Sequence, residues 1–396
     1  MFEKKNSINI DNFSVFAPGL PAGSKRIKFL DENRVLLIEN DADQYIFRVF
    51  SDKGEEFRFT SDIAKGQFQG ALWFDGFLWL EFHETIGPYE EDYLIYKSDG
   101  KTTELIASFT RESYAHDMAW HRLFIKDGAL FVHLIRHNRF HHYQITNDEA
   151  VELDVMEGGR WYLAGPYPLC IIGSTLEIYD ADLNLVNTAP SDGEIDDIKY
   201  GWSPSPAFLA FTLTDLSQEE TILYTHHPDA QSVYSAYLEY PVADLGVSGG
   251  RVWLNPYEFT LDTKDLGGLM VYDRFASPLY IHLRPAHSSN SFGAYPPPFH
   301  RSEGVFALTD GLTLVTEATR LKVFDYNCHN IQELSIAHPE CFALSPNSQR
   351  CVILYIDRGK YAQEGVTTHK DAELVFYEWN ALSDGGKVIE MLRFQK

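Results

Sequence analysis

The chain has 396 residues, of which 44% are hydrophobic and 14% aromatic, a composition that supports a large packed core and differs from that of disordered chains. Its 33 Lys and Arg residues against 57 Asp and Glu residues give a formal net charge of −24. This charge disfavours nucleic acid and anionic membrane surfaces as partners, because both are negatively charged.

The first residues, MFEKKNSINIDNF, contain no signal-peptide core, and no later apolar run reaches the roughly 18 residues of a membrane span. The four cysteines lie at spacings that match no metal or redox motif; they are Cys170, Cys328, Cys341 and Cys351. We therefore expect reduced thiols and a cytoplasmic protein.

Along the chain, a short apolar run is repeatedly broken by a tight-turn signal and followed at once by another apolar run. Asp-Gly and Ser-Gly-Gly supply the positive φ angles that hairpin turns require, and Pro presets φ at the first turn position. Each site predicts a hairpin; the eight turns lie around Asp31, at Asp75 and Gly76, at Asp127 and Gly128, and at Gly165, Ser203, Ser248, Asp310 and Ser345.

After most of these hairpins a polar loop leads to a third apolar run that ends in an aromatic residue and a carboxylate, as in LEIYD, LMVYD, LKVFD and LVFYE. A fourth run usually follows, as in NLVNT, PLYIHLRP and KVIEMLRF. Four antiparallel strands in each repeat match one blade of a β-propeller.

The last repeat carries the most specific landmarks, AHPECFALSPNSQRCVILYID followed by AELVFYEWN. It resembles a WD-repeat blade through His338, through Ser345 to Ser348, and through Tyr377 with Glu378. The chain thus resembles the β-propeller superfamily, with loosely WD-repeat-like blades. The resemblance implies an all-β fold of eight, alternatively seven, four-stranded antiparallel blades.

We expect a single domain over residues 1–396, because no Gly/Ser-rich or charged linker divides the chain. Residues 1–26 form an N-terminal segment in which Ile8 to Phe16 is expected to supply the outer strand that completes the last blade. Closure of this kind removes exposed sheet edges.

Histidines are concentrated at His116, His121, His133, His137, His141 and His142. We expect the strand that contains His133 to end near Arg136 and the following RHNRFHH to be a polar loop. Because Arg136 and Arg139 disfavour a dication, the sequence predicts no metal site here. DADLN, starting at Asp180, lacks the Gly and Glu of a calcium loop and predicts a hairpin turn. Nucleotide-binding and common hydrolase motifs are missing as well, so we expect no cofactor.

Five long segments are expected to be loops on one face, around the mouth of the central channel: His83–Tyr93, Ser191–Tyr200, Asn255–Gly267, Ser289–Gly304 and Asp357–Glu373. Long loops in a compact fold usually serve binding or catalysis. These combine carboxylates with aromatic residues, so aromatic anchors and acidic steering would suit a basic protein partner; a solvated loop face that is simply acidic is an equal alternative. The residues expected to bind the partner are Tyr89, Glu90, Glu91, Asp92, Glu194, Asp196, Asp197, Tyr257, Glu258, Asp262, Asp265, Tyr295, Phe299 and Tyr361.

The sequence therefore favours a non-catalytic, protein-binding propeller, with an inhibitor or immunity-type protein as a narrower version. The alternative is a propeller enzyme of lyase, hydrolase or lactonase type that acts on a small molecule or saccharide at the channel mouth, with or without a metal. Candidate catalytic residues are histidines and one carboxylate on the expected loops: His83, His116, Asp117, His300 and His369.

Overall fold

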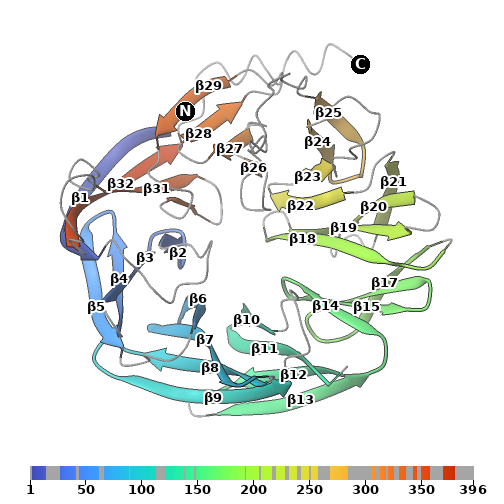
Figure 1. The fold of residues 1–396 in the computed structure, drawn as a ribbon, viewed down its shortest axis with the longest axis horizontal. Helices are drawn as coiled ribbons and strands as arrows, with labels where there is room; N and C mark the ends of the chain where they lie inside the picture. Colours follow the sequence, from blue (N-terminus) through green and yellow to red (C-terminus); the bar gives the residue numbers. More distant parts are fainter. Residues whose placement is uncertain are drawn as a thin grey trace. The chain divides into compact units, whose positions relative to one another are not determined.

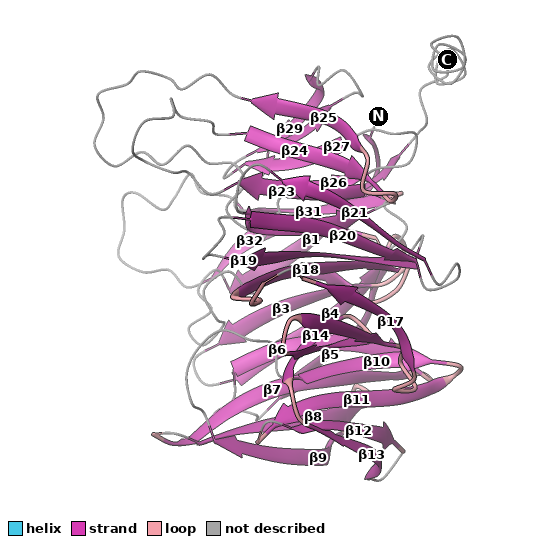
Figure 2. Ribbon diagram, turned by 90° about the vertical axis from the view of Figure 1, so that its right-hand side faces the viewer, coloured by secondary structure: helices cyan, strands magenta, loops and turns pink. Residues whose placement is uncertain are grey.

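The computed structural model describes residues 2–14, 27–41, 44–61, 67–88, 90–112, 121–137, 139–146, 149–191, 193–204, 207–215, 220–227, 232–238, 242–248, 251–256, 268–283, 305–307, 313–317, 320–324, 330–335, 342–345, 349–356 and 369–379. These residues form strands and turns without a helix (Figure 2). No helix within them is long and apolar enough to cross a membrane. The chain divides into two compact units, one of Met1–Ala64 with Pro297–Lys396 and the other of Lys65–Pro296, here called unit 1 and unit 2.

Unit 2 contains five four-stranded antiparallel sheets that follow one another in chain order (Figure 1). The first two are β6 (Gln67–Phe74), β7 (Phe77–Gly87), β8 (Glu90–Ser98) and β9 (Thr103–Glu112), then β10 (His121–Lys126), β11 (Ala129–Arg136), β12 (Arg139–Ile145) and β13 (Ala150–Glu157). The third and fourth are β14 (Arg160–Ala164), β15 (Tyr167–Ile172), β16 (Thr175–Tyr179) and β17 (Leu185–Pro190), then β18 (Asp197–Pro204), β19 (Ala207–Asp215), β20 (Glu220–His227) and β21 (Ser232–Leu238). The fifth is β22 (Val242–Ser248), β23 (Arg251–Pro256), β24 (Gly268–Asp273) and β25 (Pro278–Leu283).

Unit 1 contains three such sheets. The first is β2 (Ile27–Phe29), β3 (Val35–Asp41), β4 (Gln44–Ser51) and β5 (Gly54–Ser61), and the second is β26 (Val305–Ala307), β27 (Thr313–Glu317), β28 (Arg320–Phe324) and β29 (Asn330–Ser335). The third combines β30 (Phe342–Leu344), β31 (Arg350–Ile356) and β32 (His369–Trp379) with β1 (Phe2–Ser14) from the other end of the chain.

In the sequence, all eight predicted turns fall at the boundary between the first and second strands of a repeat, and the described residues form eight four-stranded sheets and not seven. Asp75 and Gly76 have φ angles of 50° and 80°, and Asp127 and Gly128 have φ angles of 50° and 74°. Positive φ at both central residues is typical of the type I′ turn, whose twist matches that of the two strands. The Asp-Gly signal therefore predicts both the position and the local geometry of these hairpins.

The N-terminal strand completes the last sheet, as the sequence predicts. β1 pairs antiparallel with β32, from Phe2 opposite Trp379 to Ser14 opposite His369, and it begins earlier than the expected Ile8. Its side chains Ile10 and Phe13 are fully buried among apolar residues of β2, β3, β31 and β32. The run KVIEMLRF lies outside the described residues. The prediction of one domain over residues 1–396 remains a prediction.

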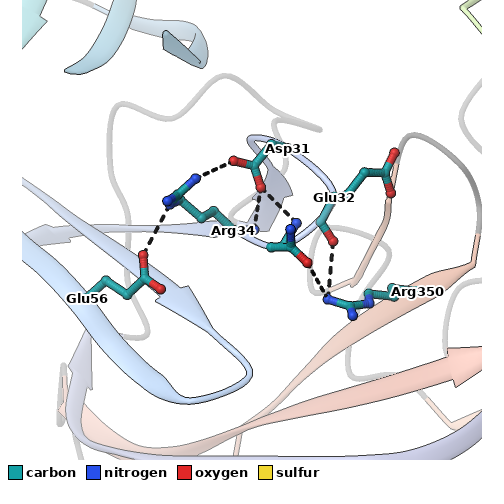
Figure 3. A network of polar contacts seen from close by, with 6 residues as sticks. Asp31, Glu32, Arg34, Glu56 and Arg350 are labelled. Atoms are coloured by element: carbon teal, nitrogen blue, oxygen red, sulfur yellow. Dashed lines mark hydrogen bonds and ion pairs between the residues drawn. The ribbon is translucent and has the colours of Figure 1, made fainter. Parts of the chain in front are cut away.

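A polar network also joins the first and last sheets of unit 1 (Figure 3). Asp31 accepts a hydrogen bond from the backbone N–H of Asn33 at 2.7 Å and pairs with Arg34 at 2.6 Å, and Arg34 reaches Glu56 at 3.1 Å. Arg350, at the start of β31, donates to the Asn33 side chain at 2.9 Å. The β2–β3 turn is therefore held by its own carboxylate and tied to the last sheet.

Apolar side chains between successive sheets form the core of unit 2. Trp79 and Tyr93 from one sheet pack with Leu123, Val132 and Leu134 from the next. A sheet packed between two neighbouring sheets buries both faces of its strands, which explains the runs of consecutive buried residues in β12, β14 and β15.

Candidate interaction face

In unit 2, the connections between sheets and between second and third strands lie at the same end of the strands. This follows because each sheet is antiparallel with its strands in chain order, so first and third strands begin where second and fourth strands end. We call this end the front face of unit 2; it is the end at which β6, β10, β14, β18 and β22 begin. The opposite end, with the turns between first and second strands, is the back face.

At the front face, the segment His83–Tyr93 is a hairpin and not the expected long loop. β7 continues to Gly87 and β8 begins at Glu90. The polar residues fit a strand because β8 pairs on both sides, with β7 and with β9, so its backbone groups are satisfied despite few apolar side chains. Glu90, Glu91 and Asp92 therefore lie on strand β8.

These three carboxylates differ in their availability to a partner. Glu91 forms an ion pair with Arg111 at 3.2 Å, and Asp92 accepts a hydrogen bond from the Thr110 hydroxyl at 2.6 Å. Glu90 is exposed at the tip of the hairpin. A partner would thus contact Glu90 first, while Glu91 and Asp92 are held by β9.

A second acidic stretch precedes and begins β18. Glu194 and Asp196 are exposed, and Asp197, the first residue of β18, pairs with Lys199 at 3.0 Å. Only the first part of the expected loop Ser191–Tyr200 is a connection, because the strand begins at Asp197.

Close packing fixes the start of this connection. A Cβ built on Gly193 would lie 1.7 Å from Oδ2 of Asp215, so no other residue fits there without displacing the buried carboxylate. The Arg160 guanidinium donates to the backbone oxygen of Ile195. The carboxylates that follow are presented by a backbone that its neighbours hold in place.

The two acidic stretches do not form one continuous patch. The sheets β10–β13 and β14–β17 lie between them in unit 2 (Figure 1). At the front face these sheets present Arg136, Arg139 and Arg160, and Arg139 pairs with Glu157 at 2.9 Å. Among the described residues of the front face, the two acidic stretches are therefore separated by a region in which three arginines outnumber the carboxylate of Glu157.

Beneath the β7–β8 hairpin lies a partly buried polar cluster of His83, His121, Glu81 and Tyr93, here called the His83 cluster. The Nε2 atoms of His83 and His121 are 2.6 Å apart, so one imidazole donates and the other accepts. His121 Nδ1 lies 3.4 Å from Oε2 of Glu81. The Tyr93 hydroxyl donates to the same oxygen at 2.7 Å, and its ring stacks on His121 with centroids 3.8 Å apart.

Burial dominates the electrostatics of this cluster. It lowers the pKa of His83 to about 3, helped by the electrostatic effect of the neighbouring His121 and Arg111, while Glu81 acts in the opposite direction. Burial also raises the pKa of Tyr93 well above its usual range, assisted by Glu81. His83 is therefore neutral at pH 7 and Tyr93 is a hydrogen-bond donor.

The order carboxylate, imidazole, imidazole resembles a proton relay, in which the carboxylate orients one ring and that ring orients the next. No three His, Cys, Asp or Glu side chains in the described ranges are arranged to hold a metal ion. His121, Glu81 and Tyr93 were not among the predicted site residues. Their signal was indirect: His83 lies in the last part of β7 and His121 begins β10 at the same face.

The other predicted catalytic residues are not brought to this cluster by the described structure. His116, Asp117 and His300 lie outside the described residues. His369 lies on β32 in unit 1 and not in the loop expected for Asp357–Glu373, because its backbone pairs with Ser14 of the N-terminal strand.

Of the histidines after Arg136, His141 and His142 lie on a strand and not in the expected polar loop, whereas His137 lies in the turn between two strands. β11 ends at Arg136 as predicted, but β12 begins at Arg139, and His141 and His142 are buried within it. His141 contacts Glu152 at 2.8 Å, and His133 is packed among aromatic rings. These residues are core histidines, and the turn at Asp180, whose carboxylate accepts from the N–H of Asn184, is the predicted hairpin.

The remaining predicted partner-binding residues lie outside the described residues; they are Tyr89, Tyr257, Glu258, Asp262, Asp265, Tyr295, Phe299 and Tyr361. The described part of the predicted surface consists of Glu90, Glu91, Asp92, Glu194, Asp196 and Asp197.

No protein-family model matches the chain, and no curated protein matches it in sequence. Among solved structures, the Dos1 propeller is similar with a TM-score of 0.51 and 11% identity, and the match covers 95% of each chain. The WD40 domain of SCAP from fission yeast gives a TM-score of 0.42 and 9% identity over 87% of this chain and 81% of that one. Together with the eight four-stranded antiparallel sheets, the likeness to the Dos1 propeller shows that the fold of this chain is a β-propeller.

Proposed function

We propose that this propeller is a non-catalytic protein-binding scaffold and that the front face of unit 2 binds a partner with a basic surface. The observation that carries the proposal is the exposure of Glu90, Glu194 and Asp196 at strand ends whose backbone is fixed by neighbouring contacts. Carboxylates on a backbone that is already fixed bind a cationic surface at a smaller entropic cost than carboxylates on a mobile loop. The net charge of −24 would steer such a partner over a longer range.

The arrangement of charges refines this proposal. Because Arg136, Arg139 and Arg160 separate the two acidic stretches, the partner would contact two acidic places and avoid the basic strand ends between them. An inhibitor or immunity-type protein that masks a cationic protein is the narrower version of the same proposal, and it shares these contacts.

A charge-reversal pair tests the proposal. The partner would first be captured from cells of the source organism. The double variant Glu90→Lys with Glu194→Lys should lower its affinity by about tenfold, since each exposed ion pair contributes up to about 1 kcal/mol. The matched control is Glu104→Lys with Glu149→Lys, which makes the same change in net charge at exposed positions on the back face. Equal weakening by both pairs would show that only overall charge matters and would reject a localised binding face.

A second candidate, favoured by the His83 cluster, is a propeller enzyme that acts on a small molecule or saccharide. The relay of Glu81, His121 and His83 would serve as a general base. A panel of sugars and lactones, with and without divalent metals, would be screened for thermal stabilisation. Stabilisation that disappears in His83→Asn supports this candidate, and a panel without any effect counts against it.

A further inference from the structure

The back face of unit 2 carries a rigid turn that joins two neighbouring sheets. In the β24–β25 turn, Oδ1 of Asp273 accepts hydrogen bonds from the backbone N–H groups of Phe275 at 2.8 Å and Ser277 at 2.9 Å. The backbone oxygen of Arg274 accepts from the Thr225 hydroxyl at 2.8 Å and contacts the ring of His227, both on β20. The turn is therefore fixed internally and fastened to the adjacent sheet.

This turn presents aromatic surface to solvent. Phe275 is 43% exposed and Tyr234, on β21, is 38% exposed. Their rings meet edge to face with centroids 5.2 Å apart, and the His227 ring stacks against Phe275 at 5.9 Å. The Arg274 guanidinium lies 4.8 Å from the centroid of the Phe275 ring. We call Tyr234, His227, Arg274 and Phe275 the aromatic corner.

The aromatic corner has the composition of an interface hot spot. Tyr and Arg are enriched among residues that dominate binding energy, and aromatic rings contribute large contact areas with few rotatable bonds. The hydrogen bonds of the Asp273 carboxylate and the Arg274 backbone oxygen hold the backbone of the turn, and the ring contacts of Phe275 with Tyr234 and His227 position the side chains, so less ordering entropy is lost on binding. Exposed aromatic rings that are fixed in this way suit recognition better than mobile ones.

We propose that the aromatic corner is a second docking site, which accepts a peptide segment of another protein that carries a carboxylate next to an aromatic side chain. The aromatic side chain would cover Tyr234 and Phe275, and the carboxylate would pair with Arg274. Charge supports this occupant: Arg274 is an exposed cation on a chain whose net charge is −24, so it selects a carboxylate where most of the surface repels one. The site lies on the opposite face from the proposed basic-partner surface and prefers the opposite charge.

The test uses two blocked dipeptides, acetyl-Glu-Phe-amide and acetyl-Lys-Phe-amide, titrated into the full chain labelled with 3-fluorotyrosine. The fluorine resonance of Tyr234 is identified by its loss in Tyr234→Phe, and Tyr237, exposed on the same strand, serves as an internal control. We expect a saturable shift of the Tyr234 resonance with both peptides. The dissociation constant should be about threefold lower for the glutamate peptide, which corresponds to the free energy of one exposed ion pair.

Two variants separate the parts of the site. Arg274→Gln should abolish the preference for the glutamate peptide and leave aromatic binding, whereas Phe275→Ala should abolish saturable binding of both peptides; both side chains are exposed, so neither variant removes core packing. No saturable shift of Tyr234, or equal affinity for the two peptides in the unsubstituted chain, would overturn the proposal. An equal shift of Tyr237 would show non-specific association and would overturn it as well.

Discussion

Replacing Ile10 with alanine tests whether the N-terminal strand is an integral part of the last sheet. Ile10 is fully buried on β1 between the first and last sheets of unit 1. The substitution removes three carbons, which corresponds to about 2.4 kcal/mol of transfer free energy at about 0.8 kcal/mol for each buried CH₂ group. The cavity left behind raises the expected loss of unfolding free energy to about 3–5 kcal/mol.

The assay is denaturant unfolding of the full chain followed by tryptophan fluorescence. Trp379 on β32 reports on this sheet, because its ring contacts Phe2 of β1 with centroids 5.0 Å apart. The control is Asn9→Ala, at an exposed neighbour of Ile10 on the same strand, which should change the unfolding free energy by less than about 0.5 kcal/mol. If Ile10→Ala costs no more than the control, β1 does not carry the packing described and the closure of the sheet by the N-terminus is refuted.

Three further predictions concern buried groups. Burial lowers the pKa of His133 to about 2, so the stability that its neutral ring contributes is complete above the unfolded pKa of about 6.5 and is lost as the pH falls toward 2. His133→Phe should therefore reduce the slope of unfolding free energy against pH, between about pH 3 and 6, by about 1.4 kcal/mol per pH unit. An unchanged slope in that range would contradict this prediction. Gly165 has a φ of 64°, and a Cβ there would lie 2.5 Å from the Trp202 ring. Gly165→Ala should therefore lower the unfolding free energy by more than about 1 kcal/mol. A thermal unfolding midpoint close to that of the unsubstituted chain would show that the ring moves aside without cost. Arg48 pairs with the buried Glu39 at 3.2 Å. Arg48→Met should lower the unfolding free energy by about 3–5 kcal/mol, because it leaves that carboxylate without its cation. Restored stability in the double variant Arg48→Met with Glu39→Gln would confirm this cause.

The turns of this fold could be predicted from the sequence because their chemistry is local. Asp75 with Gly76 and Asp127 with Gly128 adopt the positive φ angles that their residue types favour, and both form the expected hairpins. The pairing of β1 with β32 could be predicted for a different reason: an outer strand supplied by the N-terminus covers an exposed sheet edge, and Ile8 and Ile10 alternate with polar residues as a strand requires.

The loops could not be predicted equally well, because polar residues tolerate a strand when both neighbouring strands satisfy the backbone. Glu90, Glu91 and Asp92 have the composition of a loop, yet β8 receives hydrogen bonds from β7 and β9. The meeting of His83 with His121 depends on two sheets stacking, which no spacing in the sequence encodes.

Salt dependence of partner binding is the sharpest test of the proposal that the front face of unit 2 binds a basic protein. Affinity of the captured partner would be measured at about 50 mM and about 500 mM salt for the unsubstituted chain and for Glu90→Lys with Glu194→Lys, since exposed ion pairs are screened over the Debye length of about 10 Å at 0.1 M. We expect a steep loss of affinity at high salt for the unsubstituted chain and a much smaller loss for the variant. Equal affinity at both salt concentrations, or the same salt dependence in both proteins, would contradict it.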